Sequence, residues 1–135
     1  MSKPKVGLIG VGKWGSILNK KLKKNSNLLF SANSKTTYEN KLKLVDWVFI
    51  ATPDQTHFSI VKKIILKKKN IFCEKPLTLN SKETKFLFNL ANKNKIKLYV
   101  DNIQSFHNKK IKLSKNNFIT RQKKGLGNPK YLLYR

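Results

Sequence analysis

A glycine-rich turn between an apolar run and an amphipathic segment is the feature that most constrains how this chain folds. The apolar run over residues 5–9 predicts a short buried strand, and the turn GVGKWG at residues 10–15 follows it directly. Apolar residues at helical spacing then predict a helix over residues 13–24; they are Trp14, Ile17, Leu18 and Leu22. A strand, a glycine turn and a helix in this order are typical of the first unit of a parallel α/β sheet.

The same alternation of strand and helix patterns continues along the chain. Further strands are expected over residues 28–32, 45–51, 70–73 and 96–100, and further helices over residues 54–69 and 80–93. The polar segment 33–44 leaves room for one helical turn at most. Strands that alternate with helices predict an α/β fold with a doubly wound parallel sheet. We therefore expect a Rossmann domain over residues 1–105.

Caps and apolar faces define the two later helices. Asp54 is placed to cap the first of them, and Asn80 with Glu83 resembles a capping box for the second. The apolar face of the first is expected at Phe58, Val61, Ile64 and Ile65. That of the second is expected at Phe86, Leu87, Leu90 and Ala91. Both faces have the spacing of helices that pack against a sheet.

The character of the sequence changes after Asp101. Residues 102–128 are rich in Lys and Asn, and the glycine- and proline-containing segment 125–129 predicts a turn. Residues 130–135 then have a strand pattern. We interpret residues 106–135 as a remnant or the start of a second domain, truncated to at most its first helix and strand.

The net charge of +24 comes almost entirely from lysine. Of 30 basic residues only Arg121 and Arg135 are arginine, and the lysines alternate with apolar residues as on solvated helix faces. Surfaces that read bases or clamp phosphates favour arginine, because its guanidinium forms paired hydrogen bonds that lysine does not. The lysines are therefore interpreted as solvated surface residues rather than as a nucleic-acid-binding surface, although the charge should still attract anionic ligands.

The chain has no sequence feature of a membrane or disulfide-bonded protein. No apolar run reaches the roughly 18 residues of a membrane span. Lys13 and the glycines interrupt the apolar N-terminal stretch, so it does not resemble a signal peptide. The single cysteine, Cys73, lies in an apolar run and is expected to be buried and inert. We expect a cytoplasmic protein, without a metal site.

Each glycine of the turn has a distinct physical role if the turn holds a dinucleotide. Gly10 permits the tight turn, Gly12 lets a pyrophosphate approach the backbone, and Gly15 lets helix and strand pack closely. The phosphates then lie at the helix N-terminus, beside Lys13 and Trp14. A glycine turn without a ligand is the alternative. Trp14 either packs under the cofactor or fills the core, and we favour the core.

Two further motifs follow the turn in the same order as in a known family. They are VFIATPDQTH at residues 48–57 and NIFCEKPLT at residues 70–78. With them, the chain resembles the N-terminal half of the Gfo/Idh/MocA oxidoreductases, the family of glucose–fructose oxidoreductase and inositol dehydrogenase. The resemblance covers residues 5 to about 105 and extends loosely over residues 106–135.

The resemblance implies roles for these motifs. The glycine turn would hold the cofactor pyrophosphate, and Ala51, Thr52 and Pro53 would line the cofactor with His57 near it. Glu74, Lys75 and Pro76 would meet the nicotinamide, with the lysine facing the substrate. For His57 the alternative is a first-turn residue that packs or bonds to the backbone. The family also carries a second domain that binds substrate and supports oligomers.

Lys75 is the candidate catalytic residue. It follows a predicted parallel strand at its carboxyl end, where open α/β sheets bind ligands. An ammonium group there holds a hydroxyl oxygen and assists its proton loss as hydride leaves. The alternative is that Lys75 is one more surface lysine.

The residues after the second predicted strand bear on cofactor choice. NAD-binding Rossmann domains place a carboxylate there to bond the ribose 2′-hydroxyl. This chain has Asn33, Ser34 and Lys35 instead, with no carboxylate before Glu39. An amide, a hydroxyl and an ammonium group tolerate a 2′-phosphate, so NADP is slightly favoured over NAD.

The predicted function is an NAD(P)-dependent oxidoreductase domain. The family's usual substrate is a sugar, a cyclitol or a sugar derivative, and the chain is expected to be incomplete as an enzyme on its own. A homo-oligomer or a separate chain would supply the substrate domain. A non-catalytic dinucleotide-binding module is the alternative, and a basic nucleic-acid-binding protein is a more distant one.

Overall fold

The computed structural model describes residues 3–101, which form five strands, three α-helices and two short 3-10 helices. Along the chain these are β1 Lys5–Ile9, α1 Lys13–Asn25, β2 Asn27–Ala32, η1 Glu39–Leu44, β3 Trp47–Ile50, η2 Asp54–Thr56, α2 His57–Leu66, β4 Asn70–Cys73, α3 Ser81–Lys93 and β5 Leu98–Val100. Strands and helices therefore alternate as the sequence predicts.

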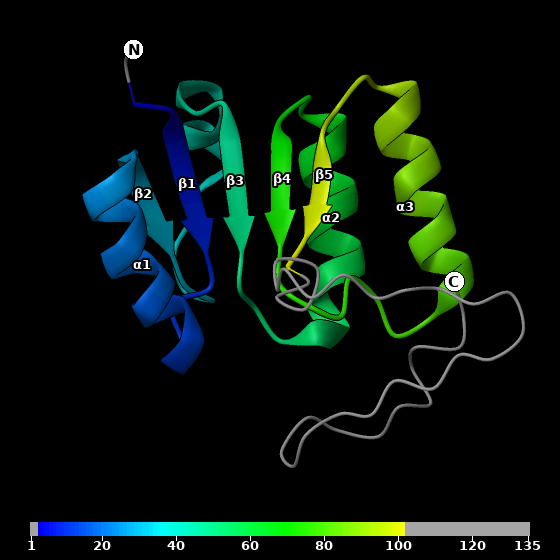
Figure 1. Cartoon of the computed structure of the whole chain (residues 1–135), viewed down its shortest axis with the longest axis horizontal. Helices are drawn as coiled ribbons and strands as arrows, with labels where there is room; N and C mark the ends of the chain where they lie inside the picture. Colours follow the sequence, from blue (N-terminus) through cyan, green and yellow to red (C-terminus); the bar gives the residue numbers. More distant parts are fainter. Residues whose placement is uncertain (1–2, 102–135) are drawn as a thin grey trace, which may run out of the picture. The chain divides into compact units, whose positions relative to one another are not determined.

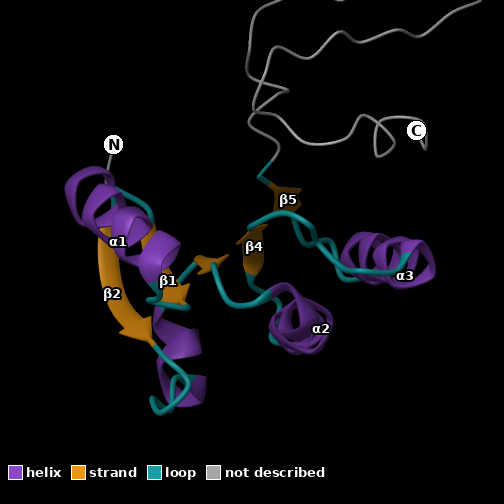
Figure 2. Cartoon of the chain, turned by 90° about the horizontal axis from the view of Figure 1, so that it is seen from below, coloured by secondary structure: helices purple, strands orange, loops and turns teal. Residues whose placement is uncertain are grey.

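All five strands are parallel and lie in the order β2-β1-β3-β4-β5 (Figure 1). The chain starts at β1, moves outward to β2, and then crosses to the other side of β1 to continue with β3. Helix α1 covers one face of the sheet, while α2 and α3 lie on the other (Figure 2). The predicted fold class, a doubly wound parallel α/β sheet, is confirmed.

Strand side chains alternate between two apolar layers, one on each face of the sheet. Under α2 and α3 the layer includes Ile9, Phe30, Val48, Ile50, Ile71, Cys73, Val61, Ile64, Ile65, Leu87 and Ala91. Under α1 it includes Val6, Leu8 and Leu22, with Trp47 and Phe49 partly buried against them. Burial on both faces explains why the strands read as nearly continuous apolar runs in the sequence.

Hydrogen bonding between the strands continues one residue past their carboxyl ends. The first residue after each of four strands donates its N–H to the last residue of the neighbouring strand, at 2.8 or 2.9 Å. These four donors are Gly10, Ala51, Glu74 and Asp101. The loops that begin with them therefore start side by side, at the end of the sheet where doubly wound folds bind ligands.

Several predicted boundaries differ from the structure. Helix α2 begins at His57 rather than Asp54, because residues 54–56 form η2, and the Asp54 carboxylate accepts from the Gln55 N–H instead of capping α2. Helix α2 ends at Leu66 rather than at residue 69. Lys68 has a φ of 54°, a left-handed backbone conformation that is incompatible with a right-handed α-helix. The segment predicted to hold one turn at most contains the six-residue η1.

Predicted helix faces are only partly buried. In α3, Leu87 and Ala91 are buried as expected, whereas Phe86 is 44% exposed. In α1 only Leu22 of the four apolar positions is buried. The first turn of α1, which contains Trp14, extends past the carboxyl ends of the strands (Figure 1). The predicted cap of α3 is confirmed, because the Asn80 side chain accepts from the Lys82 N–H at 2.8 Å.

Some predictions fall on residues that the structure does not describe. The turn at 125–129, the strand at 130–135 and the domain boundary near residue 105 lie outside residues 3–101. They stay predictions. Within the described part of the chain, no helix is both long enough and apolar enough to cross a membrane.

Candidate functional site

Two glycines of the turn occupy positions that exclude any side chain. Gly10 has a φ of 96°, and a Cβ atom there would collide with the backbone of Ala51 and Thr52. A Cβ atom on Gly15 would collide with the carbonyl oxygen of Gly10. Gly10 therefore lets the loop after β1 turn tightly beside the loop after β3, and Gly15 lets α1 approach the end of β1 closely.

Gly12 differs from these two because the space beside it is open. A Cβ atom there would meet no atom within 4 Å, and its φ of −64° suits any residue. Gly12 is also the N-cap of α1, and no side chain within residues 3–101 caps this helix or places an acidic group in its first turn. The first N–H groups of a helix attract anions, so this open space suits a phosphate group.

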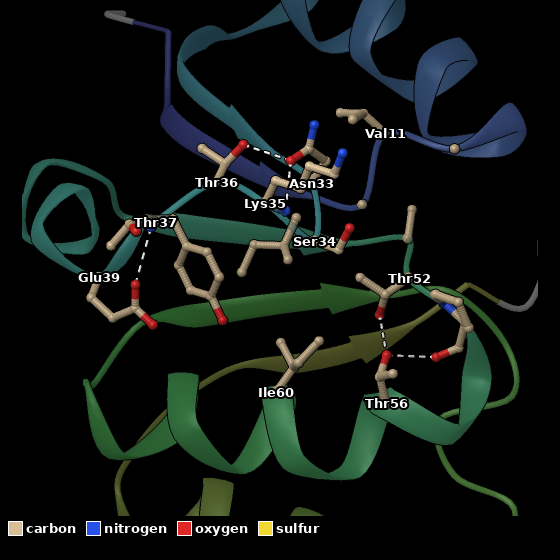
Figure 3. Close-up of a pocket in the computed structure, with 16 residues that line it drawn as sticks. Val11, Asn33, Ser34, Lys35, Thr36, Thr37, Glu39, Thr52, Thr56 and Ile60 are labelled. Carbon is tan, nitrogen blue, oxygen red and sulfur yellow. Dashed lines mark hydrogen bonds between the residues drawn. The ribbon is translucent and has the colours of Figure 1, made fainter.

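A cleft of about 870 Å³ opens in front of the glycine turn at the carboxyl ends of β1, β2 and β3. Eight predicted site residues line it: Gly10, Gly12, Asn33, Ser34, Lys35, Ala51, Thr52 and Pro53. The residues after β2 form one side, and Thr52, Thr56 and Ile60 form the opposite side (Figure 3). The cleft has the volume of a typical small-ligand site.

The loop after β2 presents hydrogen-bond donors to the cleft. The Asn33 side-chain oxygen accepts from the Lys35 N–H at 2.9 Å and from the Thr36 hydroxyl at 2.8 Å, which orders the loop (Figure 3). With that oxygen engaged, the Asn33 amide group, the Ser34 hydroxyl and the exposed Lys35 ammonium group line this side of the cleft. This side is therefore suited to an anionic group.

Glu39 also lines the cleft, but its carboxylate is already bonded. It forms an ion pair with Lys63 of α2 and accepts from the Tyr38 N–H at 3.1 Å. The hydrogen bond from Lys63 is the main reason that the pKa of Glu39 lies below its usual value. Lys63 thus neutralises the carboxylate on this side of the cleft.

Trp14 is exposed, so the prediction that it fills the core is wrong. The residue is 49% exposed, and its indole N–H donates to the carboxylate of Glu74, sixty positions along the chain. Burial raises the pKa of Glu74, the indole bond opposes that shift, and the carboxylate of Asp101 adds to it. A single hydrogen bond therefore joins the start of α1 to the loop after β4.

His57 is buried between two loops. It is 1% exposed, its Nδ1 lies 2.7 Å from the Pro76 carbonyl oxygen, and its Nε2 lies 2.9 Å from the Thr52 carbonyl oxygen. Of the two predicted possibilities, this placement matches a first-turn residue that bonds to the backbone. The ring lies behind the cleft wall rather than in its lining.

Lys75 is exposed at the carboxyl end of β4, between Glu74 and Pro76. Seven predicted site residues do not line the cleft, although they lie at the same end of the sheet: Lys13, Trp14, Gly15, His57, Glu74, Lys75 and Pro76. The cleft thus gathers the predicted ribose residues and two of the glycines predicted to face the phosphates, but none of the predicted reaction residues Glu74, Lys75 and Pro76. Cys73, the last residue of β4, is buried as expected, and burial raises the pKa of its thiol to about 12.

The cleft also includes residues that the sequence analysis did not select. They are Ile9, Val11, Thr36, Thr37, Tyr38, Glu39, Thr56 and Ile60. Thr52, Thr56 and Ile60 are four residues apart, and this helical spacing is the signal that would have indicated a common face. The Thr56 hydroxyl bonds to the Thr52 hydroxyl at 2.8 Å, which holds this wall together.

A comparison with family models identifies the chain's relatives. Residues 17–102 match the model of the Gfo/Idh/MocA family, described as an oxidoreductase family with an NAD-binding Rossmann fold. The chain belongs to this family. The matched range begins just after the glycine turn, so the match does not include Gly10, Gly12 or Gly15.

Individual relatives are longer proteins of the same fold. An uncharacterized oxidoreductase of Streptococcus pneumoniae is 26% identical over 122 residues, which cover 77% of this chain and 33% of that protein. The uncharacterized oxidoreductase YrbE of Bacillus subtilis is 36% identical over 70 residues, 50% of this chain and 20% of that protein.

A solved structure agrees with these matches. The UDP-N-acetylglucosamine 3-dehydrogenase GnnA of Acidithiobacillus ferrooxidans matches with a TM-score of 0.74 and 25% identity, covering 79% of this chain and 41% of that one. This chain thus spans about a third of the length of the pneumococcal relative.

Proposed function

We propose that the chain carries the NAD(P)-binding part of an oxidoreductase that transfers hydride to or from a sugar, a cyclitol or a sugar derivative. The observation that carries this proposal is the open space beside Gly12, at the uncapped N-terminus of α1 and in front of the cleft. The dehydrogenase from Acidithiobacillus ferrooxidans acts on a nucleotide sugar, which supports this substrate class.

Different residues at this end of the sheet would bind different parts of the cofactor and substrate. The first N–H groups of α1 would hold the pyrophosphate, and Asn33, Ser34 and Lys35 would hold the adenosine ribose. Bound there, the nicotinamide cofactor supplies the acceptor or donor of hydride. The Lys75 ammonium group would hold the reacting oxygen of the substrate and move its proton.

We propose a preference for NADP over NAD on the charges around the loop after β2. This side offers donors from Asn33 and Ser34 and the cation of Lys35, while Lys63 already pairs the nearby Glu39 carboxylate. A 2′-phosphate gains charge-assisted hydrogen bonds there. A 2′-hydroxyl would need a carboxylate to accept its hydrogen bond, and the Glu39 carboxylate is already paired with Lys63.

We also propose that the 135-residue chain binds cofactor without completing a substrate site. A further domain, a second copy or a separate chain would then supply the remaining walls. The greater length of the matched relatives supports this proposal.

Substitution of Gly12 tests the proposed site. Gly12→Val should fold normally, because the added atoms meet open space and the backbone suits any residue. It should weaken binding of NADPH by about a hundredfold or more in calorimetry, because the valine fills the space that the phosphates need.

Lys20→Val, on the exposed part of the same helix, is the matched control and should bind like the unmodified chain. Gly15→Ala provides the structural contrast, because its methyl group has no room and should lower the free energy of unfolding by about 1–3 kcal/mol. Equal affinity in the Gly12→Val variant and the unmodified chain would show that the site is wrongly placed.

A further inference from the structure

His57 joins two loops that come from different strands. Thr52 belongs to the loop after β3, which lines the cleft, and Pro76 belongs to the loop after β4, which contains Glu74 and Lys75. The His57 ring lies between the carbonyl oxygens of Thr52 and Pro76, within hydrogen-bond distance of both. It is fully enclosed, so water does not satisfy either nitrogen.

The chemistry of the two partners restricts the state of the ring. A carbonyl oxygen only accepts hydrogen bonds, and a neutral imidazole has a single N–H. A ring with one N–H therefore donates to one loop and packs its other nitrogen against the carbonyl group of the other loop, so it contacts both loops in either tautomer.

We propose that His57 is a positioning residue, which holds the loop after β4 against the cleft wall because its ring contacts the carbonyl groups of both loops. Lys75 directly precedes Pro76, so the bond to the Pro76 carbonyl fixes the chain segment that carries Lys75. At the other end of the ring, Thr52 is held in the cleft wall by the Thr56 hydroxyl. The ring thus sets the distance between the reaction residues and the cleft. The part of this proposal that concerns cofactor rests on the proposed function, whereas the two-sided clamp does not.

The hydrogen bonding of the ring is measured without any ligand. The chain has two histidines, so the His107→Gln variant leaves His57 as the single reporter in a sample labelled with nitrogen-15. Nuclear magnetic resonance should show a His57 ring N–H proton that is protected from exchange and coupled through a hydrogen bond to a carbonyl group of Thr52 or Pro76. A ring N–H proton that exchanges freely with water would overturn the clamp.

Binding measurements test what the clamp does for the site. His57→Phe keeps an aromatic ring without donors, and His57→Gln keeps a donor, so at least one folded variant is expected. Each should bind NADPH about tenfold more weakly. Affinity for 2′-phospho-ADP-ribose, which lacks the nicotinamide, should stay within about twofold of the unmodified chain, because the glycine turn and the loop after β2 are untouched.

The exposed Gln55→Ala in η2 is the matched control and should change neither affinity. Equal losses for both ligands in the His57 variants would mean that His57 only supports the fold, and would overturn the positioning role. If the unmodified chain bound neither ligand, the proposed function would fail, while the resonance experiment would still decide the clamp.

Discussion

The two sides of the candidate site are built in different ways. On the cofactor side, the glycine turn and the loop after β2 rely on backbone geometry and on bonds between residues a few positions apart, such as those of Asn33 with Lys35 and Thr36. On the reaction side, the loop after β4 is held by side chains from elsewhere in the chain, Trp14 and His57. The loop after β2 is thus ordered by local bonds, whereas the loop after β4 depends on contacts between distant segments.

This difference predicts that binding and turnover are separable in the 135-residue chain. Hydride transfer requires the reacting carbon to be held about 3–3.5 Å from the nicotinamide, whereas Lys75, the residue proposed to hold the substrate, is exposed. The purified chain should therefore bind NADPH but show no turnover with a panel of sugars and cyclitols, followed by absorbance of the reduced cofactor. Turnover above about 1 s⁻¹ would show that the reaction side is complete after all.

Removing the Lys75 amine should affect the reaction side alone. In a complete enzyme, assembled with whatever domain or chain completes the site, Lys75→Ala should lower kcat by about a hundredfold, the effect of losing a positioned acid–base group. Cofactor affinity should stay unchanged, because Lys75 lies outside the cleft lining. Lys67→Ala, at an exposed lysine between α2 and β4, gives the baseline for charge removal. Unchanged kcat in Lys75→Ala would return this residue to the surface lysines.

Reversing one charge on the cofactor side should change which dinucleotide binds. Lys35→Glu places a carboxylate in the loop after β2, which repels a 2′-phosphate and accepts from a 2′-hydroxyl. The ratio of NADP to NAD affinity should fall by about 10- to 100-fold, as measured by calorimetry with both cofactors. The exposed Lys43→Glu controls for the change in net charge. An unmodified chain that prefers NAD would contradict the assignment.

Glu74 should produce the smallest effect, on stability rather than on binding. The pKa of the Glu74 carboxyl group is raised in the folded protein, mainly by burial. The protonated group therefore adds to the free energy of unfolding in acid, and this contribution is lost as the pH rises through the raised pKa. Glu74→Gln removes the titration and keeps an oxygen that accepts from Trp14. The variant should therefore gain stability relative to the unmodified chain between acidic and neutral pH, by less than about 1 kcal/mol after solvent screening.

Urea unfolding at both ends of that pH range measures the difference. A stability difference that stays constant with pH would show that the Glu74 carboxyl group is not perturbed by its surroundings. A loss of stability at neutral pH would show that the ionised carboxylate, rather than any acceptor oxygen, is what Trp14 requires.

The amino-acid sequence by itself determined the order of strands and helices, the parallel sheet and the roles of Gly10 and Gly15. These features depend on periodicity and on steric limits that act over short distances along the chain. The cap at Asn80 belongs to the same class, since its bond reaches only to Lys82. Asp54 shows the limit of such local rules, because a short 3-10 helix took the place of the helical turn it was expected to cap.

Only the tertiary structure decided how the reaction side is assembled. Trp14 has the spacing of a core residue, yet it is exposed and bonds to Glu74 because the first turn of α1 extends beyond the strands. His57 was recognised as a site residue, but its place between two carbonyl oxygens follows from the meeting of two loops. On the cofactor side, the ion pair of Glu39 with Lys63 of α2 likewise depends on how the chain folds. Each of these contacts joins residues far apart in the chain, and local patterns carry no information about which loops the sheet brings together.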